Sequence, residues 1–264
     1  MNEWLLLLIA TTAGSLLSLV GGIYLLYGKW AVVKLQRIAV PFAAGALLAA
    51  TFLDVLPEAL EAGEIKPVLI ATLVGLLFFF VLEQSLTWFH HHHGEGETHD
   101  HTRRNVWLIV IGDTIHNFLD GLAIGAAFLI SPATGVVTAI AIAAHEIPQE
   151  LGDFGLMLSK GMHGSRVLIV NIFSALVTVV GAVLVYGLGS DLSIPEWLLL
   201  AVTAGFFLYI AASDIIPTIH AEPRRIVANL QTIVLIIGVI FVGVTASFAH
   251  SFIPHDNTQS EHRD

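Results

Sequence analysis

The feature that most constrains this chain is an apolar stretch that recurs eight times along its 264 residues. Each stretch is about 20 residues long, which is the length that an α-helix needs to cross the roughly 30 Å hydrocarbon core of a bilayer. Little chain remains between the stretches for a water-soluble domain. The sequence therefore predicts a single domain over 1–264, an all-α polytopic membrane protein with eight transmembrane helices in a bundle. The expected spans are 4–27, 38–60, 67–89, 106–130, 134–160, 166–189, 196–219 and 230–252.

Composition supports this class, because 56 % of the residues are hydrophobic and only 12 % are charged. A soluble domain of this size carries about twice that share of charge. The first stretch is long and lacks a small-residue cleavage site after it, so we interpret it as a retained helix rather than a signal peptide. The lipid bilayer is the expected surrounding, and no nucleic-acid partner is expected.

The basic residues predict an orientation in the membrane. When the loops are assigned alternately to the two sides, nine Lys and Arg residues fall on one side and two on the other. The positive-inside rule places the larger group in the cytoplasm. Both chain termini are then outside, in agreement with an even number of spans. The nine are Lys29, Lys34, Arg37, Arg103, Arg104, Lys160, Arg166, Arg224 and Arg225, and the two are Lys66 and Arg263.

The chain has no cysteine, which excludes disulfides and thiolate metal ligands. Any metal site must therefore use imidazole, carboxylate and amide groups. A His-rich segment over 90–105 connects the third and fourth spans, and such tracts bind borderline metals weakly. We expect metal capture by this cytoplasmic loop, with a plain solvated linker as the alternative. Its histidines are His90, His91, His92, His93, His99 and His101.

The fourth span carries polar side chains on one stripe. Their spacing follows the i, i+3, i+4, i+7 rule of a helix face. Ionisable groups inside a bilayer are costly, and they usually mark an ion or proton path. Because none of these groups is Lys or Arg, the expected passenger is a cation. Gly121 and Gly125 predict close packing of this helix against a neighbour. The stripe consists of Asp113, His116, Asn117 and Asp120.

The fifth span carries a second polar group around a proline. His145 and Gln149 are one helical turn apart, and Pro148 deprives the helix of one hydrogen bond. We expect the helix to bend there and a backbone carbonyl near residue 144 to be freed. The remaining polar residues of this span are Glu146, Glu150 and Asp153.

Two further spans repeat a shorter pattern, an acidic residue three positions before a proline. Asp54 precedes Pro57 in the second span, and Asp214 precedes Pro217 in the seventh. Internal repeats of this kind occur in transporters where helices are broken around the path. Asp54 and Asp214 are therefore predicted pathway residues.

The two polar spans together resemble the paired signature of a known family. His116-Asn117-x-x-Asp120-Gly121, followed by His145-Glu146-x-Pro148-x-Glu150-x-Gly152-Asp153-Phe154, looks like the motifs of the ZIP (Zrt/Irt-like) metal transporters, and within them a prokaryotic relative of the LIV-1 branch. The resemblance implies movement of divalent metal, typically zinc and often iron, manganese or cadmium, towards the cytoplasm through a binuclear centre between the fourth and fifth helices. It also implies a prokaryotic inner (plasma) membrane, and homodimers are common among such proteins.

Carried over by position, the resemblance implies ligands for two ions. The first ion would be held by His116, Asp120, His145 and Gln149. The second would use Asn117 and Glu146, with residues 120 and 149 as bridges and Asn171 as a neutral ligand. Gln149 stands where many LIV-1 members have His. Asp113, Glu150 and Asp153 are further second-site or pathway candidates.

The donor set itself favours transfer over storage. Mixed imidazole, carboxylate and amide ligands suit Zn²⁺ and tolerate Fe²⁺, Mn²⁺, Co²⁺ or Cd²⁺. Two readings from other classes stay open. An intramembrane zinc protease would use His145-Glu146 as the start of a HExxH pattern, but Gln149 replaces the second His. A metal sensor would bind zinc without moving it. We expect a transporter and not an enzyme.

Overall fold

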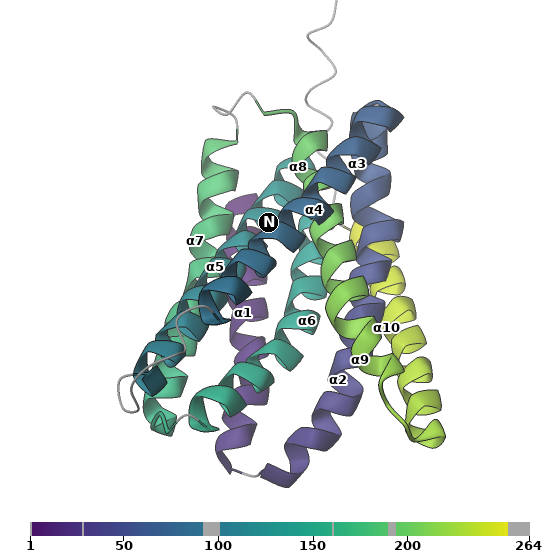
Figure 1. Ribbon diagram of the computed structural model, residues 1–264. Helices are drawn as coiled ribbons and strands as arrows, with labels where there is room; N and C mark the ends of the chain where they lie inside the picture. Colours follow the sequence, from purple (N-terminus) through teal and green to yellow (C-terminus); the bar gives the residue numbers. More distant parts are fainter. Residues whose placement is uncertain (1, 28, 92–100, 160, 190–193, 253–264) are drawn as a thin grey trace, which may run out of the picture.

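The computed structural model describes residues 2–27, 29–91, 101–159, 161–189 and 194–252, and these are helical almost throughout. Their helices form eight lengthwise segments that pack as a bundle (Figure 1). Six segments are continuous, namely α1 (Glu3–Tyr27), α4 (Ile65–His91), α5 (His101–Ile130), α6 (Pro132–Ser159), α7 (Gly164–Leu188) and α10 (Arg225–Phe252). Two are composite, namely α2 (Lys29–Ala50) with η1 (Thr51–Val55) and α3 (Leu56–Ala62), and α8 (Glu196–Tyr209) with η2 (Ile210–Ile215) and α9 (Ile216–His220).

The eight predicted segments are confirmed as helices, and the main differences from the prediction lie at their ends. The second segment begins at Lys29 instead of residue 38, and the fourth begins at His101 instead of 106. Hydropathy marks the edge of the hydrocarbon layer, whereas a helix can continue beyond that edge into water. The first turns of these two helices contain basic residues, so the apolar pattern did not include them although they are helical.

Five of the described segments are long and apolar enough to cross a membrane by length and composition: 3–24, 37–62, 65–82, 164–188 and 225–252. The helices α5 and α6 do not meet that criterion, because their ionisable side chains lower the hydropathy. Trp197–Ser213 is apolar but shorter. The chain is an integral membrane protein in which α5 and α6, the helices with the two polar motifs, pack against each other.

The two composite segments are widened in the same way. A π-helical segment, η1 or η2, comes shortly before Pro57 or Pro217. Proline has no N–H to donate to the preceding turn, and a local π-helical turn re-pairs part of the backbone. The helices are therefore widened at the predicted positions but not broken. Helix α6 likewise stays helical through residue 148.

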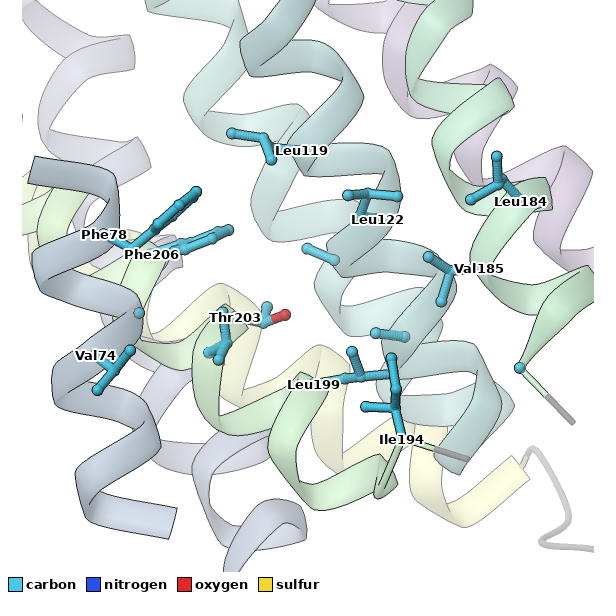
Figure 2. Close-up of a pocket in the computed structure, with 15 residues that line it drawn as sticks. Val74, Phe78, Leu119, Leu122, Leu184, Val185, Ile194, Leu199, Thr203 and Phe206 are labelled. Carbon is cyan, nitrogen blue, oxygen red and sulfur yellow. The ribbon is translucent and has the colours of Figure 1, made fainter. Parts of the chain in front are cut away.

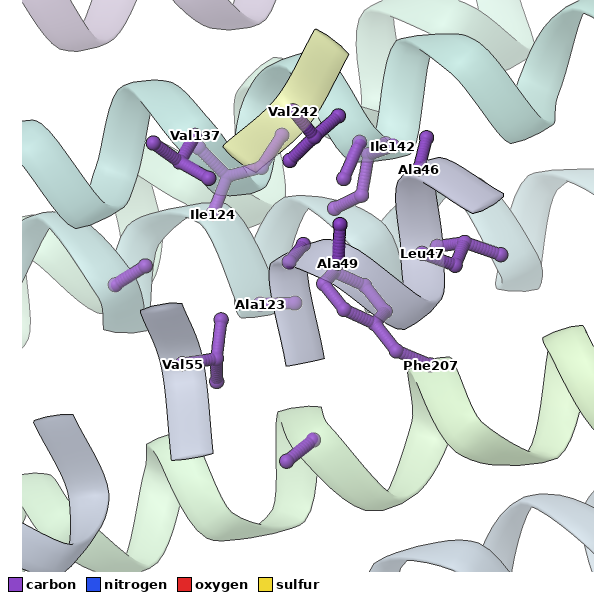
Figure 3. Close-up of a cluster of buried hydrophobic side chains, with 14 of the residues drawn as sticks. Ala46, Leu47, Ala49, Val55, Ala123, Ile124, Val137, Ile142, Phe207 and Val242 are labelled. Atoms are coloured by element: carbon purple, nitrogen blue, oxygen red, sulfur yellow. The ribbon is translucent and has the colours of Figure 1, made fainter. Parts of the chain in front are cut away.

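Small side chains bring the helices close together in the core (Figure 3). Ala46, Ala49 and Ala50 of α2 are essentially inaccessible, and a Cβ added to Gly45 would collide with the Leu235 carbonyl of α10. Larger side chains from other helices, such as Phe207, fill the spaces between them. Association of helices in lipid relies on this close packing, because the surrounding acyl chains are as apolar as the helix surfaces.

Candidate metal centre

Helix α5 is fixed against α7 by two glycines on its inner face. A Cβ at Gly121 or Gly125 would collide with the carbonyl oxygen of Thr178 or Ala182. The approach is reciprocal, since a Cβ at Gly181 would meet the Phe118 carbonyl at 2.6 Å. The close packing predicted from the two glycines is therefore present, and the neighbour is α7. This contact sets the rotation of α5 and turns its polar stripe into the bundle.

Three ligand-type side chains meet between α5 and α6. His116 and Asp120 are one turn apart on α5, and His145 faces them from α6. The Nε2 atoms of the two histidines lie 3.2 Å apart. Oδ2 of Asp120 lies 3.5 Å from His116 Nε2 and 3.2 Å from His145 Nε2. All three donor atoms fall within 4.8 Å of one another, a group that could hold a metal ion. We refer to these residues as the trio.

The three side chains of the trio are buried to different degrees. The side chains of His145 and Asp120 are 1 % and 5 % exposed, whereas that of His116 is 16 % exposed. The ring of Phe79 from α4 stands edge-on to the His116 imidazole, at a centroid distance of 5.6 Å. His116 is therefore the least buried member of the trio, and the Phe79 ring packs against it. Nothing in the sequence pattern pointed to Phe79.

Hydrogen bonds leave several acceptors of this region unsatisfied. Both carboxylate oxygens of Glu146 are buried without a hydrogen-bond partner among the described residues. One Glu150 oxygen, Oε2, is in the same state. Oδ2 of Asp120 is also buried and has the imidazole nitrogens of His116 and His145 beside it. A buried carboxylate oxygen without a partner is costly. A divalent cation is the partner that would satisfy such oxygens together.

The amide of Asn117 is held by a network with α7. Its Nδ2 donates to Asp113 Oδ1 at 3.0 Å and to Ser174 Oγ at 3.2 Å. Its carbonyl oxygen accepts from the Thr178 hydroxyl at 3.0 Å. The amide plane is therefore fixed, with its nitrogen towards Asp113. Ser174 and Thr178 are supporting residues that no spacing rule relates to the α5 stripe.

The other predicted ligands lie around the trio without joining it. Asn171 is buried on α7, where its Nδ2 donates to the Val167 carbonyl and its Oδ1 has no partner among the described residues. Gln149 and Asp153 are half buried on α6. The side chain of Asp214 and those of His90, His91 and His101 lie outside the described residues. His92, His93 and His99 lie outside them entirely.

Asp54 has a partner that the sequence did not suggest. It is buried in η1, and its Oδ1 lies 2.7 Å from Nε2 of His250 on α10. The two residues are 196 positions apart, so no local spacing could have paired them. The sequence had placed Asp54 on the path but had assigned no role to His250.

An apolar cavity of about 560 Å³ lies between α4, α5, α7 and α8 (Figure 2). Leu119 and Leu122 line it from α5, and Thr203 supplies its polar group. Its lining contains no His and no carboxylate, so this cavity offers a cation no strong ligand. Among the described residues, the group that could hold a metal ion lies instead on α5 and α6.

The sequence was compared with known proteins. The family described as "ZIP Zinc transporter" matches residues 1–106 and 90–246. Zinc transporter ZIP10 of Danio rerio is 40 % identical over 121 residues, 45 % of this chain and 14 % of that protein. Zinc transporter ZIP4 of Mus musculus is 44 % identical over 111 residues, 42 % of this chain and 17 % of that protein. Zinc transporter ZIP10 of Homo sapiens is 38 % identical over 156 residues, which is 48 % of this chain and 19 % of that protein. The chain spans less than a fifth of the length of these three relatives.

Proposed function

This chain belongs to the ZIP zinc transporter family, and from that premise we propose that it moves divalent cations, zinc above all, across a membrane. The observation that carries the proposal is the trio. Two imidazoles and one carboxylate from α5 and α6 converge within 4.8 Å at a buried position. In a membrane protein such a group marks an ion path by default.

We assign the first ion to His116, Asp120 and His145, with Gln149 as the fourth ligand. The donor set of the trio suits Zn²⁺, which prefers four ligands and accepts nitrogen and oxygen donors. Fe²⁺, Mn²⁺, Co²⁺ and Cd²⁺ are further cargo candidates, because no thiolate restricts the site to soft metals. A neutral amide as the fourth ligand keeps the charge around the ion low, which favours release.

We assign a second ion to Asn117 and Glu146, with Asp120 and Gln149 as bridges and Asn171 as an additional neutral ligand. The unpaired oxygens of Glu146 and Asn171 support this assignment. Asp113, which is tied to Asn117 by a hydrogen bond, would support the second site from α5. Glu150 and Asp153 continue along α6 beyond it and form the release route in this scheme.

The proposed direction is towards the cytoplasm. The ends of α1, α6 and α9, and the starts of α2, α5, α7 and α10, gather at one end of the bundle (Figure 1). The basic residues of the sequence cluster at those helix ends, and basic ends face the cytoplasm. We further propose a prokaryotic inner membrane with both termini outside, metal capture by the histidines of 90–105, and a homodimer. The role is that of a transporter without enzymatic activity.

Reconstituted uptake tests the proposal. Liposomes that contain the full chain would be supplied with ⁶⁵Zn²⁺ and then with Fe²⁺, Mn²⁺, Co²⁺ and Cd²⁺ in competition. We expect His145→Ala and Asp120→Ala to slow zinc uptake by about 10- to 100-fold, the range seen when support for a metal is removed. His220→Ala, an exposed histidine at the end of α9, is the matched control and should transport like the wild type. Wild-type rates in both trio variants would overturn the assignment.

A further inference from the structure

The apolar cavity between α4, α5, α7 and α8 has a buried floor and an exposed mouth (Figure 2). On the floor, Thr203 of α8 and Ala126 of α5 are 3 % and 2 % exposed. At the mouth, Val74 and Phe78 of α4 are 54 % and 53 % exposed, and Leu184 of α7 is 43 % exposed. The cavity therefore opens to the surroundings of the bundle between α4 and α7.

The medium outside this mouth is lipid. The mouth residues of α4 belong to the segment 65–82, and Leu184 of α7 belongs to the segment 164–188. Both segments are long and apolar enough to cross a membrane. The hydrocarbon layer of the bilayer therefore lies directly against the opening, and its acyl chains are the molecules that can enter.

The cavity runs parallel to the helices that line it. On α5 its lining extends from Leu119 to Ala126, and on α8 it extends from Leu199 to Phe206. Each stretch covers seven helical steps of about 1.5 Å, so the cavity follows the bundle for about 10 Å. We propose that an acyl chain of a bilayer phospholipid occupies this cavity, which we call the acyl-chain site. Neither the family resemblance nor the trio assigns such a site.

The lining selects an apolar occupant. Among the described residues that form it none is charged, and the hydroxyl of Thr203 is its polar group. Water would find too few hydrogen-bond partners there, and an empty space of about 560 Å³ would forfeit van der Waals contacts along its walls. Because none of those residues is Lys or Arg, nothing in the cavity would bind the carboxylate of a free fatty acid. A phospholipid avoids this problem, since its head group stays at the bilayer surface.

Two aromatic rings separate the acyl-chain site from the trio. Phe206 lines the site, and its ring packs against that of Phe79 at a centroid distance of 5.1 Å. Phe79 in turn stands against the His116 imidazole. A chain in the site would therefore hold both rings in place beside a metal ligand without contacting the ion. This effect on the trio rests on the proposed function, whereas occupation of the site by lipid does not.

Photo-crosslinking tests occupation directly. The full-length protein is reconstituted in vesicles of palmitoyl-oleoyl-phosphatidylcholine that contain a small share of a phosphatidylcholine with a diazirine in the middle of one acyl chain. After irradiation, mass spectrometry locates the lipid adducts. We expect adducts at Ala126 and none at Ala49 of α2, which is equally buried at 2 % but does not line this cavity. Equal labelling of the two alanines, or no label at either, would overturn the acyl-chain site.

A cavity-filling variant gives a second test. Figure 2 shows Leu122 of α5 beside the open space, and Leu122→Trp places a larger ring where the chain would lie. We expect labelling of Ala126 to fall by about tenfold or more, because the ring and the chain cannot share the space. Leu176→Trp, on the exposed side of α7, is the matched control and should leave the labelling unchanged. Undiminished labelling of Ala126 in Leu122→Trp would contradict the proposal, and an unlabelled Ala49 shows that this variant keeps its packed fold.

Other occupants give different results. If excess palmitate abolished the label at Ala126, the occupant would be a free fatty acid and the phospholipid would be excluded. A second copy of the chain is tested with Leu122→Cys, which carries a single thiol because the sequence has no cysteine. Disulfide-linked dimers of Leu122→Cys in vesicles would likewise overturn the acyl-chain site.

The two proposals fail separately. If the wild type moved no metal into liposomes while Ala126 was labelled, the proposed function would fall and the acyl-chain site would stand. Zinc uptake without labelling of Ala126 would have the opposite meaning.

Discussion

The backbone contact between α5 and α7 can be tested at Gly125, because a Cβ at that position has no room. It would lie 2.5 Å from the Ala182 carbonyl oxygen. Carbon–oxygen contacts of this kind settle at about 3.3 Å or more, so Gly125→Ala must separate the two helices by roughly 0.8 Å. The obstacle is backbone, and no change of rotamer can relieve it.

The magnitude follows from a comparison within the same helix. A Cβ at Gly112 of α5 meets nothing within 4 Å. Both alanines gain about 1 kcal/mol of helix propensity, and only Gly125→Ala adds the overpacking cost of about 1–3 kcal/mol. Propensity therefore cancels in the difference between the two variants. That difference corresponds to a melting temperature roughly 2–12 °C lower for Gly125→Ala than for Gly112→Ala.

Thermal unfolding in detergent, followed by the fluorescence of the five tryptophans, measures this difference. Zinc uptake should fall in parallel, because the hydrogen bond from Thr178 to Asn117 crosses the same interface. If Gly125→Ala melted at or above the temperature of Gly112→Ala, the α5–α7 contact would not be the constraint that positions the polar stripe.

Three further predictions concern charge. Glu146→Gln should reduce the zinc bound around the trio from two ions to one and slow zinc uptake. A protease would instead lose peptide cleavage in this variant and would show no metal flux. Unchanged zinc content would argue against the second ion. Uptake should fall as the pH is lowered through about 6.5, the ordinary pKa of imidazole, because a proton and a metal compete for the same nitrogen; equal liposome rates at acid and neutral pH would contradict this. The Arg224 guanidinium, by its hydrogen bond, lowers the pKa of the Glu222 carboxyl. This ion pair can stabilise the folded protein only above the ordinary carboxyl pKa, and its effect is lost as the pH falls. Both groups are exposed, so water and salt screen their interaction. Arg224→Ala should therefore leave the melting temperature at neutral pH unchanged.

The predictions that held were those that depend on local spacing. The lengths of the apolar stretches predicted eight helical segments. Helical periodicity predicted that His116 and Asp120 lie one turn apart on one face of a helix. The glycines at 121 and 125 predicted close packing against a neighbouring helix. Each of these follows from the geometry of one helix. The family resemblance then related α5 to α6, which spacing within a helix cannot do.

The features that the sequence did not give are contacts between distant segments. Phe79, Thr178 and His250 meet the polar residues from three other helices, and nothing in their own neighbourhoods marks them. Helix ends were also missed, because hydropathy reports the lipid boundary while hydrogen bonding decides where a helix begins. The partner of Asp54 therefore required the packed bundle.

The buried carboxylates give the strongest physical argument for a moving cation. Four of their oxygens lack hydrogen-bond partners among the described residues, one each from Asp54 and Glu150 and two from Glu146. No Lys or Arg is among the buried residues of the same part of the chain. Each unpaired buried acceptor lowers the stability of the folded protein by on the order of 1–3 kcal/mol. An interior with only a structural role would avoid this cost by having an apolar side chain in place of the acid. An interior that keeps several such oxygens, from η1 to α6, fits the cation movement that we propose. A bound cation that stayed permanently would leave the remaining oxygens unexplained.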